Sequence, residues 1–358
     1  MECRLPTPGV GRRLLFKDIA LPLRIGIIGA GAFASRRHLP DFLKDPRVEV
    51  VAACRRDPEQ LEHFCDHFGI PKRYTDWQGM LDSERLDGVL IATPHEQHAE
   101  QAREAMMRGL HVLAEKPMAL DADEADALAA MAAKSGVQLG VAFNPPYWRH
   151  TEEMRRGIAD GRIGELENVE IFWSGSAAAV FGRAPMPENM AGVVKPTLFR
   201  ADAGKSGGGF LMDAGGHLMS ELLWVTGKSA LRVTALVDEL PSDMRAILAI
   251  ELEGNVHVSV QLNGISACSS RRIRNTYYGV NGSAESTAAP FAVTWTDASS
   301  TIKVAEAEMP DVPTPVSDWI NAIETGSILR GSPQHGAAVT RLLCAAYRSA
   351  ASGVSERI

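Results

Sequence analysis

Asp213 and His217 stand four positions apart, directly after the glycines Gly207–Gly209. On a helix, residues four apart share one face, so a carboxylate and an imidazole would lie side by side. We expect this carboxylate to orient the imidazole and to raise its pKa. His217 could then take the proton from a secondary alcohol while Asp213 holds a neighbouring hydroxyl. The alternative is structural, with an N-capping aspartate and a buried histidine that makes one hydrogen bond.

Lys116 is a second candidate. It stands in Glu115-Lys116-Pro117, directly after the short apolar run 111–114. Ligands of doubly wound sheets bind at the carboxyl ends of the strands. An ammonium group there could hold a substrate oxygen and stabilise its negative charge as a hydride leaves or arrives. A lone lysine in a loop is more often a solvated surface residue. The Lys–Pro bond could be cis, which is the minority state of any such bond.

A glycine loop follows the first apolar run, with the sequence Gly29-Ala30-Gly31-Ala32-Phe33-Ala34. Its pattern is G-x-G-x-x-A, and a helical pattern comes after it. The first glycine permits a tight turn, and the second lets a pyrophosphate approach the backbone. Small Ala34 lets helix and strand pack closely, and the helix start attracts the phosphates. The loop therefore predicts a dinucleotide site, and a turn without a ligand is the alternative.

The end of the second apolar run indicates which dinucleotide is bound. Glu49 has the spacing of a ribose-binding acid, but it lies near the start of the run. The run ends in Cys54-Arg55-Arg56-Asp57. Because two arginines suit a 2′-phosphate, we favour NADP over NAD. Alternatively, both arginines are solvated and Asp57 caps a helix.

The elements that must position these residues alternate between strand and helix in the first half of the chain. Apolar runs predict buried strands at 23–28, 48–53, 88–92, 111–114 and 138–143. Helical patterns between them cover 32–44, 57–68, 95–108 and 121–135. This alternation predicts a parallel, doubly wound Rossmann sheet.

The pattern changes after Phe143. A helix is expected at 148–160, and strands at 166–173, 231–237, 245–252, 256–262, 274–280 and 291–296. Two further helices are expected at 213–226 and 333–351. Consecutive strands with short turns predict an open, mostly antiparallel sheet. We therefore expect an extension at 1–22, a dinucleotide-binding domain at 23–143, and a domain for substrate and oligomerisation at 144–358.

Composition excludes several classes of protein. The net charge of −7 disfavours a nucleic-acid surface, and no apolar run is long enough to cross a membrane. The five cysteines, at 3, 54, 65, 268 and 344, lack metal-binding or disulfide spacing, so we expect no metal and a reducing cytoplasm.

Taken together, the motifs resemble the Gfo/Idh/MocA family, the group of glucose–fructose oxidoreductase and inositol dehydrogenase. The resemblance is carried by Gly29-Ala-Gly31, Thr93-Pro94-His95-Glu96-Gln97-His98, the run from Gly109 to Pro117, the run from Gly207 to His217, Gly279–Glu285 and Ala345–Gly353. It implies a hydride-transferring dehydrogenase or reductase acting on a sugar, polyol or related cyclic alcohol. It also implies Lys116, Asp213 and His217 as the catalytic set.

Further site residues follow from the motifs and the resemblance. The expected cofactor-binding residues are Gly29, Gly31, Ala32, Phe33, Arg55, Arg56, Thr93, Pro94, His98, Glu115 and Lys116. Asn144 and Arg200 are the expected substrate-binding residues. In the family the open sheet commonly mediates oligomerisation, so a homodimer or homotetramer is expected.

Three positions depart from the family pattern. His95 stands where asparagine is frequent, Pro145-Pro146 follow Asn144 where arginines are common, and Ser220 replaces a common aspartate. The basic residues Arg183, Lys195, Arg200 and Lys205 hint at an acidic or phosphorylated substrate group, although such residues are commonly just solvated. Two alternatives remain: a glycosidase- or isomerase-type enzyme that retains and recycles its nicotinamide, and a non-catalytic sensor that binds the cofactor.

Overall fold

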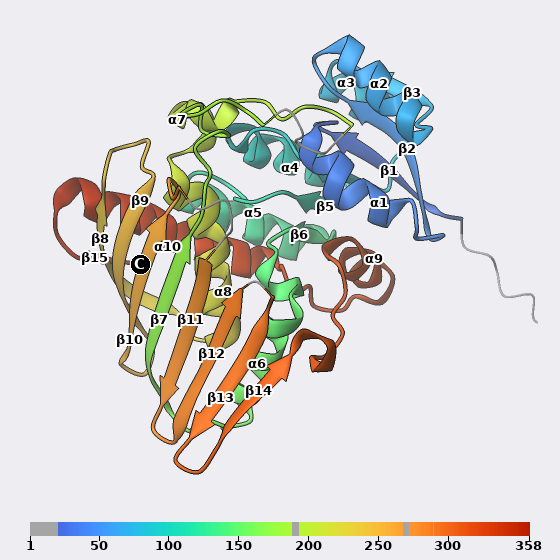
Figure 1. Ribbon diagram of the computed structural model, residues 1–358. Helices are drawn as coiled ribbons and strands as arrows, with labels where there is room; N and C mark the ends of the chain where they lie inside the picture. Colours follow the sequence, from blue (N-terminus) through green and yellow to red (C-terminus); the bar gives the residue numbers. More distant parts are fainter. Residues whose placement is uncertain (1–20, 188–192, 268–271, 289) are drawn as a thin grey trace, which may run out of the picture.

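The computed structural model describes residues 21–187, 193–267, 272–288 and 290–358. The first half of the chain forms a six-stranded parallel sheet in the order β3-β2-β1-β4-β5-β6 (Figure 1). Its strands are β1 (Leu23–Ile28), β2 (Val48–Cys54), β3 (Lys72–Tyr74), β4 (Gly88–Ile91), β5 (His111–Ala114) and β6 (Leu139–Val141). The parallel, doubly wound architecture confirms the prediction for this half.

Helices connect these strands. They are the π-turn η1 (Ala34–His38), α1 (Leu39–Phe42), α2 (Pro58–Phe68), α3 (Trp77–Ser83), the 3₁₀ turn η2 (His95–Gln97), α4 (His98–Met107) and α5 (Ala122–Ser135). Asp121 accepts hydrogen bonds from the backbone N–H groups of Asp123 and Glu124, so it caps α5. Strand β3 and helix α3 are additions to the expected elements.

The second half of the chain forms a nine-stranded sheet in the order β14-β13-β12-β11-β7-β10-β9-β8-β15. Its strands are β7 (Leu166–Ser174), β8 (Ala230–Val237), β9 (Arg245–Leu252), β10 (Val256–Asn263), β11 (Arg272–Gly279), β12 (Gly282–Ala288), β13 (Ala292–Asp297), β14 (Thr301–Ala305) and β15 (Glu356–Arg357). Neighbouring strands are antiparallel except for β10 and β7, which are parallel. The mostly antiparallel sheet was predicted, while β12, β14 and β15 were not.

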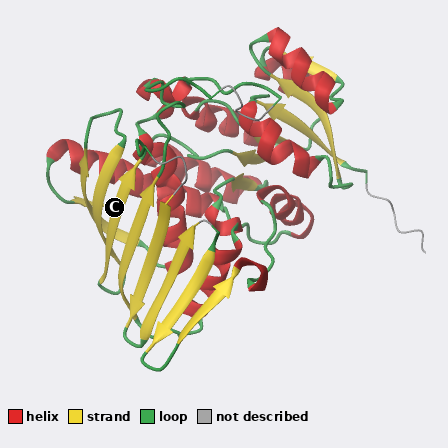
Figure 2. Cartoon of the chain, in the orientation of Figure 1, coloured by secondary structure: helices red, strands yellow, loops and turns green. Residues whose placement is uncertain are grey.

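Helices cover one face of this sheet and leave the other bare (Figure 2). The remaining helices are η3 (Pro145–Tyr147), α6 (Arg149–Ala159), η4 (Phe199–Ala201), α7 (Ala203–Ser206), the π-turn η5 (Leu211–Gly215), α8 (Gly216–Thr226), η6 (Glu306–Glu308), α9 (Pro315–Thr325) and α10 (Pro333–Ser352). Strands β8, β9 and β10 alternate buried and exposed residues, with Val233, Leu248 and Val258 among those in the core. This alternation is the signature of a sheet with one wet face.

Helix α9, in the second half of the chain, packs back onto the sheet formed by the first half. Trp319 is fully buried there, in one apolar cluster with Ile27 and Phe42, and its ring meets that of Phe42 edge to face at 6.1 Å. A Cβ on Gly88 would come within 2.7 Å of the Trp319 ring, so this glycine makes room for the indole. The core of the Rossmann sheet is therefore completed by residues beyond 314, while the expected boundary at residue 143 stays a prediction.

Over the described part of the chain, each helix is too short or too polar to cross a membrane. The free cysteines among these residues are Cys54, Cys65 and Cys344, whereas Cys3 and Cys268 lie outside the described residues, as does most of the expected extension at 1–22.

Candidate active site

The glycine loop joins β1 to the first helix, at the carboxyl end of the parallel sheet. Gly29 has φ +96°, and a Cβ on it would lie 2.6 Å from the carbonyl carbon of Ala92. Only glycine fits there, both conformationally and sterically. A Cβ on Gly31 would meet only the Arg55 guanidinium, at 3.5 Å, and the Gly29 carbonyl oxygen, at 3.8 Å. The backbone at Gly31 is thus open to a close ligand, as a pyrophosphate requires.

The helix after this loop begins with Ala32, which is buried, and Phe33, which is partly buried, and it widens into the π-turn η1. Backbone N–H groups at a helix start lack partners within the helix and attract anions. Ala34 is fully buried, which agrees with its expected role in close packing. The loop therefore fits the diphosphate of a dinucleotide.

The end of β2 carries both expected arginines. Arg55 donates to the carbonyl of Ala30 at 3.1 Å and to Gln60 Oε1 at 2.7 Å, so its guanidinium lies over the glycine loop. Burial lowers the pKa of Arg55. Arg56 is exposed, and Asp57 caps α2 by accepting from the backbone N–H of Gln60. The alternative interpretation of Asp57 as a helix cap is thereby confirmed.

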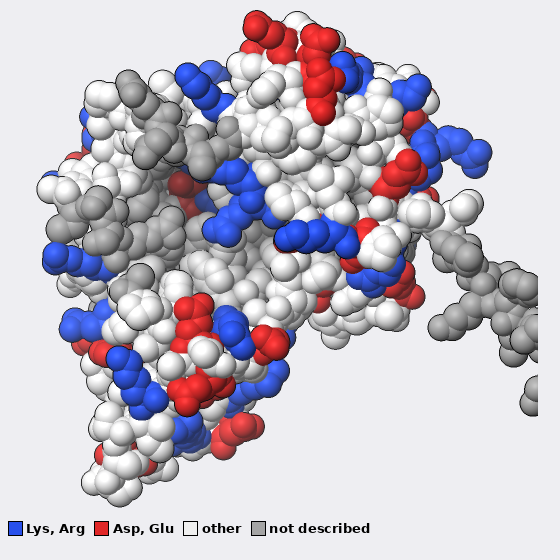
Figure 3. All heavy atoms as spheres, turned by 45° about the vertical axis from the view of Figure 1, so that its right-hand side comes forward, with Lys and Arg blue, Asp and Glu red and all other residues white. Residues whose placement is uncertain are grey.

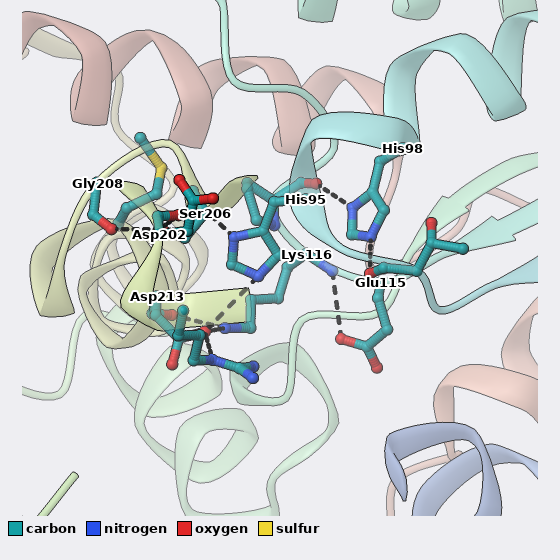
Figure 4. A network of polar contacts seen from close by, with 12 residues as sticks. His95, His98, Glu115, Lys116, Asp202, Ser206, Gly208 and Asp213 are labelled. Atoms are coloured by element: carbon teal, nitrogen blue, oxygen red, sulfur yellow. Dashed lines mark hydrogen bonds and ion pairs between the residues drawn. The ribbon is translucent and has the colours of Figure 1, made fainter. Parts of the chain in front are cut away.

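The ends of β4 and β5 are tied together by His98. Its ring nitrogens lie 2.8 Å from the carbonyl oxygen of Pro117 and 2.9 Å from that of Thr93 (Figure 4). Burial lowers the pKa of His98, and a neutral ring has one N–H, so it donates to one carbonyl at a time. Pro94, which follows Thr93 in the chain, is partly buried. His98 thus holds the loop directly after Lys116, and the Lys116–Pro117 bond is cis.

Glu115 is buried and contacts His38, whose Nε2 lies 2.5 Å from Glu115 Oε1. Burial would raise the pKa of Glu115, but the His38 hydrogen bond and neighbouring positive charge lower it overall. Sequence reasoning missed His38, because 77 positions separate it from Glu115.

Lys116 and Asp213 come together from the two halves of the chain. The Lys116 ammonium donates to Asp213 Oδ1 at 2.6 Å and to the Asp213 backbone carbonyl at 2.7 Å. Arg200 Nε lies 3.0 Å from the same Oδ1. Burial would raise the pKa of Asp213, but the charges of Arg200 and Lys116 outweigh burial and hold it well below its usual value. Asp213 is therefore an ionised carboxylate between two cations.

The local backbone explains why Asp213 can reach Lys116. It lies in the π-turn η5, and His217 follows in the first turn of α8. Single π-turns within helices often occur at functional sites. In the structure, Asp213 Oδ1 faces Lys116 and Arg200. The expected pairing of Asp213 with His217 stays a prediction. His217 is partly exposed one turn further along.

His95 is a member of this cluster that sequence reasoning noted only as a departure from the family pattern. Its Nδ1 contacts the Ser206 carbonyl at 2.9 Å, and its Nε2 lies 3.8 Å from Asp213 Oδ1 (Figure 4). Burial and the Lys116 charge hold the pKa of His95 well below its usual value. Because a carbonyl only accepts, the neutral ring carries its proton on Nδ1 and presents a lone pair on Nε2 toward Asp213.

Asn144, Ser220 and the basic residues before the glycines lie at different distances from this cluster along the chain. Asn144 lies at the end of β6, next to β5 in the sheet, and is partly buried. Ser220 is buried and contacts His335 Nε2 at 2.8 Å. Of the basic residues between 183 and 205, Arg200 reaches Asp213, whereas Arg183 pairs with Glu239 and Lys205 with Asp202. Figure 3 shows a hollow between the two lobes of the molecule, with basic side chains at its border.

The fit to a nicotinamide dinucleotide rests on the open backbone at Gly31 and on the cluster beyond it. The loop would hold the diphosphate, Arg55 and Arg56 at the end of β2 would face the ribose, and Lys116 follows β5. Within the described ranges, no group of three His, Cys, Asp or Glu side chains is placed to hold a metal ion.

Comparison with known proteins agrees with this geometry. Residues 23–143 match the model of an oxidoreductase family with an NAD-binding Rossmann fold, and residues 151–285 match the GFO/IDH/MocA C-terminal domain. The chain belongs to the Gfo/Idh/MocA family of oxidoreductases.

Individual relatives act on sugar-like molecules. The chain is 31% identical, over 54% of its length and 53% of the relative, to dTDP-3,4-didehydro-2,6-dideoxy-alpha-D-glucose 3-reductase from Saccharopolyspora spinosa. It is 28% identical to D-glucoside 3-dehydrogenase from Escherichia coli, over 59% of its length and 56% of the relative. The match thus spans about half the length of these curated relatives.

The fold also matches a solved structure, the WlbA dehydrogenase from Bordetella pertussis in complex with NADH and UDP-GlcNAcA. The TM-score is 0.75, with 21% identity over 94% of this chain and 99% of that one. At this identity the likeness establishes the fold.

Proposed function

We propose that this protein is an NADP-dependent oxidoreductase that transfers a hydride between the nicotinamide and a secondary alcohol or ketone of a sugar, polyol or related cyclic substrate. The observation that carries the proposal is the Lys116–Asp213 pair at the carboxyl end of β5, beside a glycine loop open to a diphosphate. When bound, the nicotinamide ring supplies or accepts the hydride.

Lys116 binds the reacting oxygen in this proposal. An ammonium has three hydrogens, and among the described residues Lys116 gives two of them to Asp213. The third can point at a substrate oxygen and stabilise the negative charge that develops on it during transfer. Asp213 keeps the ammonium in place, and Arg200 keeps Asp213 ionised.

His217 is the proposed proton carrier. It lies one helical turn beyond Asp213, at the start of α8, and is open enough to meet a substrate. In alcohol oxidation its neutral form takes the hydroxyl proton, and in ketone reduction its protonated form returns it.

Arg55 and Arg56 support NADP as the preferred cofactor. Both follow β2, where an acid would serve NAD and a cation suits a 2′-phosphate. Arg55 is held over the glycine loop, and Arg56 is exposed beside it. NAD is the competing cofactor, because the similar WlbA structure contains NADH.

A panel of sugars and polyols, offered with NADP⁺ and NAD⁺ and followed by NAD(P)H absorbance, tests the activity. We expect turnover with NADP⁺ and a carbohydrate whose ring carries free hydroxyls. Product formed without a net absorbance change would replace this proposal with a cofactor-recycling enzyme. Binding of dinucleotide with turnover of nothing in the panel, by either readout, would favour a sensor.

We also propose a cytoplasmic homodimer or homotetramer, assembled through the bare face of the nine-stranded sheet. Leu236 and Ile247 are register partners on β8 and β9, and they are 67% and 55% exposed. Adjacent exposed apolar side chains on an uncovered sheet favour burial against another copy.

A further inference from the structure

A segment of the second half of the chain, Val193–Ser206, crosses to the nucleotide-binding half (Figure 1). We call it the crossing segment. Val194 is 3% exposed and belongs to the same apolar cluster as Ala30, Ala34 and Ala53. Val193 packs against that cluster as well. Ala30 and Ala34 belong to the glycine loop and the helix start, so Val194 shares one apolar core with that loop.

His95 provides a second anchor. Its Nδ1 donates to the carbonyl of Ser206 at 2.9 Å, and its ring meets that of Phe199 edge to face at 4.9 Å. Both partners belong to the crossing segment, whereas His95 follows β4 of the Rossmann sheet. Edge-to-face pairs add attraction beyond simple burial.

The carboxyl end of the crossing segment makes a third set of contacts. Arg200 contacts Asp213, and Gly207, which follows the segment, faces Leu120 so closely that a Cβ would approach its side chain to 2.3 Å. Leu120 lies between β5 and α5 of the Rossmann half. The segment is therefore fastened along its length, from the glycine loop to the catalytic cluster.

We propose that the crossing segment forms the outer wall of the cofactor site, so that the second half of the chain retains the bound dinucleotide. The inference rests on the proposed function, because it requires a dinucleotide at the glycine loop. A cofactor enclosed in this way leaves only when the buried contacts of Val194 and the ring contact of Phe199 with His95 open. Its dissociation is then slow, and release of the spent cofactor limits the rate of each reaction cycle.

Replacement of Val194 by serine tests the wall. Protein loaded with NADPH, and in parallel with NADH, is mixed with excess NADP⁺ or NAD⁺ in a stopped-flow instrument, and the loss of bound-cofactor fluorescence gives the dissociation rate. Loss of most of one buried valine contact should raise that rate about tenfold, with the association rate changed less than about twofold. Val280→Ser, at a site that is 56% exposed, is the matched control.

Phe199→Leu is a second variant, which removes the ring contact with His95 and should also speed dissociation. An unchanged dissociation rate in both variants would overturn the inference. Faster association with tighter binding by Val194→Ser would also overturn it, because the segment would then occupy the cofactor's place. If wild type binds neither dinucleotide, the proposed function fails and the inference with it.

Discussion

Lys116 and Asp213 are joined twice, because the ammonium donates to both the side chain and the backbone carbonyl of the same residue. Asp213 lies in the π-turn η5. These two hydrogen bonds fix the directions of two of the three ammonium hydrogens, and the tetrahedral geometry then fixes the direction of the third.

Lys116→Met should lower kcat by about 10²–10³, because the methionine keeps the length of the side chain but offers no donor to the reacting oxygen. Steady-state rates on the best substrate of the panel, with dinucleotide affinity measured separately, check this. A methionine variant that turns over at the wild-type rate would show that oxyanion stabilisation comes from elsewhere.

His217→Ala should lower kcat by about 10²–10⁴ and leave dinucleotide affinity nearly unchanged, since the residue serves proton transfer. In wild type, oxidation should rise with pH and reduction should fall, because the two directions need opposite protonation states. The variant should lose these opposite slopes. If both slopes survive at near wild-type rates, another group is the base, and Lys116 becomes the first alternative.

Arg56→Gln should weaken NADPH binding about tenfold and leave NADH binding unchanged, because only NADPH carries a 2′-phosphate. Arg55→Asp should reverse the preference outright. Titration of both dinucleotides at one fixed salt concentration measures the ratio. Equal affinity of the wild type for both cofactors would contradict the assignment.

Leu236→Lys should split the proposed oligomer, since it places a charge at the centre of a buried apolar contact. Light scattering at micromolar concentration measures the mass. Ile328→Lys is the control, because Ile328 is 91% exposed and lies away from the bare face. A wild type that already has the mass of a monomer would remove the assembly proposal.

Glu221→Gln should stabilise the fold at alkaline pH. Glu221 is buried on α8 and accepts a hydrogen bond from Asn275 at 2.7 Å, and burial raises its pKa to about 7. The folded state therefore holds a proton that the unfolded state releases above pH about 4.5, so the free energy of unfolding falls as pH rises through that window.

Glutamine cannot ionise but can accept the same hydrogen bond. At pH 8 the variant should be more stable than wild type by about 1–3 kcal/mol, and at pH 5 the two should be nearly equal. Urea unfolding at both values measures this, with exposed Glu167→Gln as control. Burial also lowers the pKa of His150 to about 3 and of His335 to about 4, which reduces stability in acid, but equally in both proteins. A constant difference across pH would contradict the assignment.

Much of the fold could be predicted from the sequence because its strands are continuous apolar runs. β1 and β5 begin and end where expected, and each apolar run is stopped at its carboxyl end, at Gly29 and at Glu115. β3 was missed because Lys72–Tyr74 is short, polar and partly exposed. α9 was missed because its apolar face packs on the other half of the chain, which no local pattern reveals.

The site was predictable in part: the structure brings Lys116 and Asp213 together, while the catalytic role of His217 stays a prediction. Lys116, Asp213 and His217 stand in motifs, whereas contacts such as His95 with Ser206 join residues 111 positions apart. The spacing of Asp213 and His217 predicted an ordinary helical face. The structure has a π-turn at that point, and single-sequence spacing carries no sign of it.

Trp319 connects the order in which the chain is synthesised with the packing of its first half. Domains usually fold as they leave the ribosome, the amino-terminal one first. Here the nucleotide-binding half lacks its largest buried side chain until α9 has been made, about 170 residues after β6. Until then the space beside Gly88 and Phe42 has no indole to fill it, and a chain cut at residue 143 would keep that defect. The half that binds the cofactor is begun first and finished almost last.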